Sequence, residues 1–482
     1  MAGAPTVSAM SDMRGSAGRT PSPSLSVDTS TGRSLPLPGT ALCMVMVALA
    51  IGLGGGGTVN PQTEMLLQFL IALLLLPLTI SSKWQRGLGA IPRAMLLLAG
   101  LILVLPVLQL IPLPPSIWHA LPGRTIELQS LTLVQAGQTW MPLTMAPSRT
   151  FASLLAMLCP VLLMLQVSRL SLRGRNWLCV TITVGAVLSL VLGVLQLSHT
   201  GGWSWSLYSQ FSEGYLVGFQ ANHNAEADFL LISILAMGVL VTTRLGDGRH
   251  HGLTWVGFLF ILLALVIGLL MTGSRTGIAL GLPILALLGF MLWPMLRNKK
   301  TARWGLGGIV GALVIGGAAI SQLQSVQKVI ARFFLTKEAR WDLWADTWFA
   351  IHQVWPIGSG IGTIVPMLEA AERLDVVDPS RPVRAHNDWL EWILEGGLPG
   401  VILLGLVIII IATVAIRAFM EASRAGSPPA RRAQVIFGCG VLIVCGLHSI
   451  VDYPLRSMAL ATLAAIAVAL LVTPAAVQRS SS

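Results

Sequence analysis

The chain of 482 residues is strongly apolar: hydrophobic residues make up 54% of it, charged residues 11%, and its mean hydropathy is +0.76. This composition excludes a soluble globular protein and indicates an all-α polytopic membrane protein. The formal net charge of +11 does not favour nucleic acid as a partner, because the basic residues lie in short clusters between apolar runs, where membrane topology explains them.

The order of apolar and polar segments predicts the domain organisation. Residues 1–36 are rich in Ser, Pro, Gly and Thr, so we expect a disordered cytoplasmic tail. A helix needs about 20 apolar residues to cross the hydrocarbon, which predicts nine transmembrane helices within 37–320, three within 399–473 and a cytoplasmic tail at 474–482. The expected spans are 38–55, 64–81, 94–111, 151–167, 177–197, 227–243, 253–271, 276–296, 304–320, 399–416, 434–449 and 457–473.

A cytoplasmic N-terminus places most of the 31 Lys and Arg residues on the cytoplasmic side, as the positive-inside rule requires. The long loops on the other, periplasmic side are then 112–150, 198–226 and 321–398. The last of these is the one large enough to hold structure of its own, and we expect it to contain an amphipathic helix and a catalytic helix.

The segment Glu338–Trp355 is predicted to be the amphipathic helix, with four tryptophans and Ile351 on one stripe. A helix lying in the membrane interface is the favoured interpretation, and contact of its aromatic rings with sugars is compatible with it. Ile357–Gly362 follows as a flexible turn. No strand is expected before it, so it is not interpreted as a nucleotide-binding loop.

A short helix is predicted to begin with Asn387 as its N-cap and to end at Gly396-Gly397. His386 then lies just before the helix start, where the helix dipole disfavours the imidazolium and favours the neutral ring near pH 7. A neutral histidine flanked by carboxylates is a suitable general base for a hydroxyl. The alternative is a histidine that only helps to cap the helix.

Arg275 occupies a tight outer turn between two long apolar helices, where arginine is less expected. It is interpreted either as an anchor at the membrane surface or as a site for an anion such as phosphate, which suits the guanidinium fork. Arg340, Arg384 and Arg456 are further outer arginines that could join such a site.

Two other polar segments flank expected spans. Asn222-His223-Asn224 either caps a helix or faces a polar cavity, and Asp452 and Arg456 are expected either to pair with each other or to contact substrate. No metal site is predicted, because the carboxylate pairs Asp342/Asp346 and Glu391/Glu395 are typical of solvated helix faces. No cofactor is expected.

These segments together resemble the O-antigen ligase and polymerase superfamily of bacterial membrane glycosyltransferases. The resemblance is carried by His386–Glu391 followed by Glu395-Gly396-Gly397, by Thr272–Arg275 upstream, and by the large outer loop between them. Trp355–Thr363, Asn222–Asn224 and His448–Arg456 are similar to further family segments. The family often has Asn-Arg-Asn where this chain has Asn222-His223-Asn224, so one phosphate-binding arginine is missing there.

The resemblance implies an inverting, metal-independent transfer of a glycan from an undecaprenyl diphosphate carrier to an acceptor hydroxyl. It also implies that the protein lies in the inner membrane of a bacterium, with its active site on the periplasmic side. His386 matches the family's base and Arg275 an arginine at the lipid diphosphate, while Arg340 or Arg384 could replace the missing arginine. The acceptor is either a second lipid-linked glycan or lipid A-core, with polymerisation of an exopolysaccharide or O-antigen slightly preferred; membrane lipids surround the protein. The substrate-binding candidates are Arg275, Arg340, Arg384, Asn387, Asn222, His223, Asn224 and Arg456.

A transporter or flippase of lipid-linked glycans is the alternative function. In that case Arg275 and the other polar groups would line a pathway, and no bond would be made.

Overall fold

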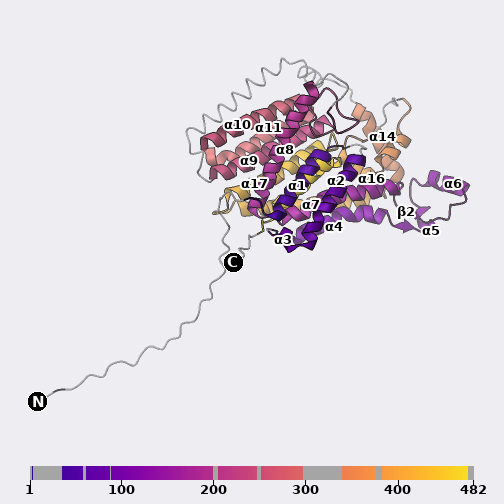
Figure 1. Cartoon of the computed structure of the whole chain (residues 1–482). Helices are drawn as coiled ribbons and strands as arrows, with labels where there is room; N and C mark the ends of the chain where they lie inside the picture. Colours follow the sequence, from indigo (N-terminus) through magenta and orange to yellow (C-terminus); the bar gives the residue numbers. More distant parts are fainter. Residues whose placement is uncertain are drawn as a thin grey trace.

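The computed structural model describes residues 3, 35–57, 61–86, 88–198, 205–246, 251–296, 339–375 and 383–475. Most of these residues are helical (Figure 1). Three apolar helices are short: α1 (Pro38–Leu53), α4 (Arg93–Gln109) and α18 (Met458–Leu471). Eight helices in the described part of the chain are long and apolar enough to cross a membrane: α2 (Pro61–Ile80), α7 (Pro147–Ser168), α8 (Leu172–Ser198), α9 (His223–Gly246), α10 (His251–Met271), α11 (Arg275–Leu296), α16 (Asp388–Ala422) and α17 (Pro429–His448).

Eight of the expected spans coincide with the eight long helices, which indicates a multi-pass membrane protein. The spans expected at 38–55, 94–111 and 457–473 coincide with the three shorter helices, so the number of twelve spans stays a prediction. The span expected at 304–320 lies outside the described residues, as do most of the expected tails at 1–36 and 474–482 and parts of the loop 321–398. The helix predicted from Glu338 is observed as α14 (Ala339–Val354), and α15 (Ile364–Ala371) follows it.

Helix α9 lies at the centre of the bundle. In the most apolar stretch of α9, 94% of the residues are buried inside the protein. In that of α16 only 6% are buried, so α16 faces outward over most of its length. Around α9 pack α8, α10, α11 and α17. Polar side chains at the start of α9 are therefore enclosed by protein, and polar groups in such a place usually have a partner or a function.

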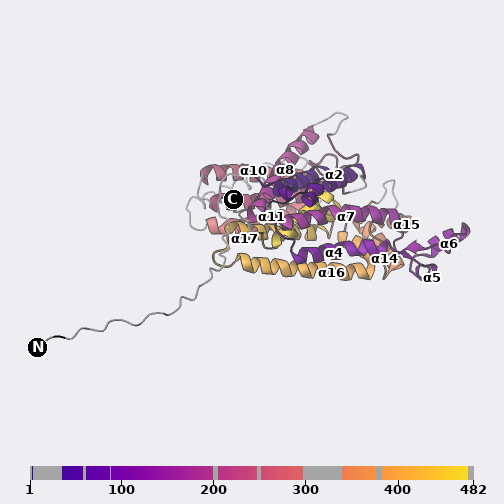
Figure 2. The ribbon, with the colours of Figure 1, turned by 60° about the horizontal axis from the view of Figure 1, so that its bottom comes forward.

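The loop 112–150 forms a small arm that projects beyond one end of the helices, next to α14 and α15 (Figures 1 and 2). It contains α5 (Pro115–Trp118) and α6 (Thr125–Leu133), and its strands β1 (Pro112–Leu113) and β2 (Met141–Pro142) pair antiparallel. Two further short elements are α3 (Ser82–Gln85) and the 3-10 turn η1 (Pro454–Arg456).

The tryptophan stripe predicted on α14 is divided by the observed packing. Ile351 is buried against α15, whereas Trp341 and Trp348 are 60% and 53% exposed. The buried Ile351 shows that packing against α15 takes up one side of the stripe, while the expected position of the helix in the membrane interface stays a prediction. The helix packs through its small and aliphatic side chains, and Trp344 turns inward because its Nε1 donates to the Ala385 carbonyl at 3.0 Å.

Helix α16 is broken near its start, as predicted. Gly397 has φ 56° and ψ −155°, which ends the short helix begun at Asp388 and redirects the chain into the long outward-facing part of α16. A Cβ at this position would lie 2.4 Å from both the Ile357 carbonyl carbon and the Pro356 oxygen. Only glycine fits, because both the backbone angles and the close approach exclude a side chain.

We expect Gly397→Ala to destabilise the protein by about 2 kcal/mol or more, since strained angles and a backbone clash act together. The measurement is thermal unfolding of detergent-purified protein. Gly405→Ala is the matched control: it lies in the same helix, and its added Cβ meets nothing within 4 Å. Equal unfolding midpoints for the two variants would contradict this account of the break.

Candidate active site

His386 lies directly before α16 in a left-handed backbone conformation, with φ 50°. This conformation costs a non-glycine residue about 1–2 kcal/mol and persists only where the surroundings impose it. Asn387 holds it on one side as the predicted N-cap: its Oδ1 accepts from the Leu390 N–H at 3.0 Å. On the other side Ala385 is fully buried, and its carbonyl accepts from Trp344.

The side chain of His386 is held by Asp452, in the turn after α17. The distance from His386 Nδ1 to Asp452 Oδ1 is 3.1 Å. The histidine side chain is 30% exposed, while that of Asp452 is 3% exposed. The imidazole also meets the Tyr453 ring edge to face, with centroids 5.0 Å apart. One edge of the imidazole is thus fixed inside the protein while the side chain still reaches the surface.

The charge of Asp452 decides which nitrogen of His386 carries the proton. Burial alone would raise the pKa of Asp452, but the hydrogen bond and charge of His386, with the charges of His448 and Arg340, hold this pKa well below its usual range. An ionised carboxylate only accepts hydrogen bonds, so Nδ1 of His386 must donate. The Nε2 lone pair is then the one that can take a proton from a hydroxyl.

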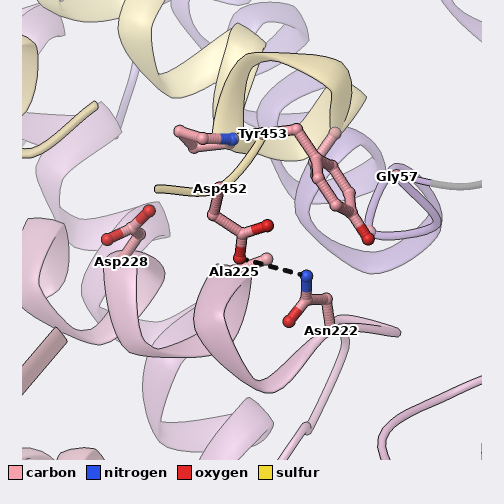
Figure 3. A pocket seen from close by; sticks show the side chains of 9 residues that line it. Gly57, Asn222, Ala225, Asp228, Asp452 and Tyr453 are labelled. Atoms are coloured by element: carbon pink, nitrogen blue, oxygen red, sulfur yellow. Dashed lines mark hydrogen bonds between the residues drawn. The ribbon is translucent and has the colours of Figure 1, made fainter. Parts of the chain in front are cut away.

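The start of α9 holds the other oxygen of Asp452. Asn224 Nδ2 donates to Oδ2 at 2.6 Å, and Asn222 Nδ2 lies 3.4 Å from the same oxygen. Figure 3 shows Asn222 directed at this carboxylate, with Tyr453 beside it. Two residues of the predicted polar segment therefore position the group that orients His386.

His223 links the same segment to the turn that carries Arg275. Its Nδ1 donates to the Thr272 carbonyl at 2.9 Å, and its ring stacks on Tyr215 with centroids 4.6 Å apart. Arg275 is half-buried and is the first residue of α11. The segment Asn222-His223-Asn224 therefore links the residues around His386 to the turn that carries Arg275.

Arg340 and Arg384 lie at the same site but in different settings. The charge of Arg340, on α14, acts on both Asp452 and His448. Arg384 donates from Nε to the Gly57 carbonyl at 3.2 Å, and its guanidinium lies 5.9 Å from the centre of the Tyr453 ring. Arg340 therefore acts on the carboxylate that holds His386, while Arg384 lies against the neighbouring Tyr453 and pairs with Glu391 at 3.4 Å.

Arg456 pairs with three buried carboxylates rather than with Asp452. Its Nη2 lies 2.9 Å from Glu395 Oε2, and its Nε lies 3.3 Å from Glu391 Oε2 and 3.5 Å from Asp388 Oδ1. Burial alone would lower the pKa of Arg456, but these carboxylates raise it above its usual value. The expected pairing of Asp452 with Arg456 is wrong, because the short helix turns its carboxylates at i, i+3 and i+7 toward the arginine.

The glycine-rich turn at 357–362 serves to hold Glu395. The Gly362 and Ile364 N–H groups donate to Glu395 Oε1 at 2.9 and 3.2 Å, and the Gly360 N–H donates to the Glu395 carbonyl at 2.9 Å. Its glycines allow close approach to Gly397 on the other side. The turn therefore fixes the short helix that follows His386.

A small cavity lies behind Asp452 (Figure 3). Its polar lining includes Asn222, Asp228, Asp452 and Ser457, and Gly55 and Gly57 close one side. Among the described residues no group of three or more His, Cys, Asp or Glu side chains is arranged to hold a metal ion.

The residue that sequence reasoning did not place correctly is Asp452. Its spacing from His386 shows no helical or strand period, so local pattern could not connect them. The usable signal was topological: the expected spans at 399–416 and 434–449 form a hairpin, which returns the segment after the second span to the side on which His386 lies.

A family model matches the part of the chain that carries four of these side chains. Residues 258–405 match the model described as Wzy_C, O-antigen ligase, and this segment includes Arg275, Arg340, Arg384 and His386. No curated protein matches the chain. This match supports the resemblance of the chain to the O-antigen ligase and polymerase superfamily.

Proposed function

We propose that the protein is a glycosyltransferase that moves a glycan from an undecaprenyl diphosphate carrier to an acceptor hydroxyl, with His386 as the general base. The observation that carries the proposal is the contact between His386 Nδ1 and the ionised, buried Asp452. A histidine held in this way presents Nε2 as the proton acceptor, and the carboxylate stabilises the imidazolium that forms.

The proposed step breaks one bond and forms another at the anomeric carbon of the donor. Nε2 of His386 takes the acceptor hydroxyl proton as the acceptor oxygen attacks. The bond from the anomeric carbon to the phosphate oxygen breaks, its electron pair leaves with the diphosphate, and the configuration inverts. The chemistry needs no metal if arginines neutralise the charge that develops on the leaving group.

Arg275 is proposed as a ligand of the diphosphate, with Arg340 or Arg384 as the second. The support is position: the Arg275 turn is bonded to His223, the charge of Arg340 acts on Asp452, and Arg384 lies against the Tyr453 ring. Asn222 and Asn224 act on the substrate through Asp452, and Asn387 acts by capping the helix after His386. Arg456 is proposed to act through the helix that its three carboxylate partners share.

The membrane setting of the proposal is the periplasmic side of a bacterial inner membrane. The eleven apolar helices described here and the segment 304–320 would make twelve spans, with the loop 321–398 outside. The proposed acceptor is a second lipid-linked glycan, which makes the protein a polymerase of exopolysaccharide or O-antigen. Transfer to lipid A-core is the related alternative.

We expect His386→Ala to lower glycan transfer by about 100-fold or more, since general base catalysis contributes that much. Asp452→Asn keeps the shape but loses the charge, and transfer should fall by about tenfold or more. The measurement is glycan length and lipid A-core decoration in the native host, at matched protein levels. His352→Ala is the control, because this exposed histidine of α14 bonds locally to the Trp348 carbonyl.

Normal glycan products in the His386→Ala strain would show that this histidine is not the base. If the proposal holds, the His386→Ala strain should accumulate lipid-linked glycan on the outer face of the membrane, because the glycan still reaches this face but is not joined to an acceptor. A strain that loses its outward movement of lipid-linked glycan would instead indicate a transporter.

Arg275→Lys should reduce transfer by about tenfold or more while membrane insertion stays normal, because lysine keeps the charge but not the two-pronged contact with phosphate. Arg373→Lys is the matched control, since Arg373 forms surface pairs with Asp342 and Asp346 at 2.9 and 2.8 Å. Near-normal transfer by Arg275→Lys would identify Arg275 as a membrane anchor.

A further inference from the structure

A second histidine–aspartate pair lies behind the first. Nδ1 of His448 is 2.7 Å from Oδ1 of Asp228, and both side chains are 1% exposed. Asp228 lies one helical turn after Asn224 on α9, and His448 lies one turn before Asp452 at the end of α17. Two polar contacts therefore join α9 to this part of the chain: Asp228 contacts His448 at the end of α17, and Asn224 contacts Asp452 in the turn that follows.

The second pair is also tied to Asp452 through the backbone. The Asp452 N–H donates to the His448 carbonyl at 2.9 Å, so the turn that presents Asp452 continues from the residue that Asp228 holds. A shift of His448 would move Asp452, and with it the ring of His386. The geometry makes Asp228 and His448 part of the support of the base.

Charge gives the pair a second consequence. Asp228 and Asp452 line the same cavity (Figure 3), so two buried carboxylates are close together. Two like charges in a site of low polarity repel strongly unless a cation lies between them. His448 is the group that contacts Asp228 directly, and its charge also acts on Asp452.

Resting on the function proposed above, we propose that Asp228 and His448 are a positioning pair that fixes Asp452 and cancels the charge of the second buried carboxylate at His386. Neither residue touches the substrate. The pair acts on transfer through Asp452 alone.

Other charged and titratable groups surround the pair, and among the described residues none of them contacts Asp228 as His448 does. They come from the elements packed around it: Asp452 and Tyr453 in the turn, Cys445 on α17, Arg340 on α14, and His386 and Asp388 at the start of α16.

Removing the histidine alone should change the pH dependence of transfer. In His448→Gln the amide still donates to Asp228, but the charge of this carboxylate is no longer cancelled. The extra negative charge favours the protonated form of His386, which cannot act as a base. The acid limb of the pH–rate profile therefore moves to higher pH, by on the order of one pH unit.

The experiment compares His448→Gln with the double variant Asp228→Asn/His448→Gln. Spheroplasts of the native host expose the outer face and carry the endogenous lipid-linked glycan pool, so glycan product is measured from about pH 5 to about pH 9. The double variant keeps an amide contact without either charge, and its acid limb should return to the wild-type position. A support role without charge cancellation would lower the plateau and leave the limb in place.

The outcomes separate this inference from the proposed function. An unshifted limb in His448→Gln, together with loss of transfer in His386→Ala, overturns the positioning pair and leaves the base assignment standing. Retained transfer in His386→Ala overturns the base itself. If His448→Gln does not accumulate, His448→Asn takes its place in the same comparison. A limb that moves to higher pH and returns in Asp228→Asn/His448→Asn supports charge cancellation, and an unmoved limb overturns it.

Discussion

A buried carboxylate must be matched by donors or cations, and in this protein that requirement at Asp452 determines how distant segments meet. Its two oxygens are held by His386 from the loop before α16 and by Asn222 and Asn224 at the start of α9. The backbone of the same residue accepts from the Asp388 N–H at 3.2 Å. The loop before α16, the start of α9 and the turn after α17 therefore meet at one carboxylate. The hydrogen bond that His386 makes to this carboxylate sets the orientation of its ring.

The cluster of charged side chains around Arg456 has a structural role. Three carboxylates of the short helix surround Arg456, and the glycine-rich turn adds N–H donors to Glu395. This arrangement turns the acidic face of the helix inward, toward Arg456. The helix that follows His386 is fixed on one side by ion pairs and on the other by backbone contacts.

Local sequence pattern was sufficient to predict the apolar helices, the Asn387 cap, the break at Gly396-Gly397 and the position of His386 just before a helix. Each of these depends on neighbours a few residues away. The partner of His386 and the role of the glycine-rich turn depend on contacts across the fold, which spacing does not encode. The tryptophan stripe of α14 depends on such contacts too: a helical period gives the faces of a helix, but packing decides which side chains of a face are buried.

The break at Gly397 also separates the site mechanically from the bilayer. A spanning helix adjusts to changes in hydrocarbon thickness mainly by tilting. If α16 were continuous, such a tilt would swing its first two turns, and His386 would swing with them. With the hinge at Gly397 and the short helix bound to Arg456 and the glycine-rich turn, the lipid-facing part can lean while the histidine keeps its place.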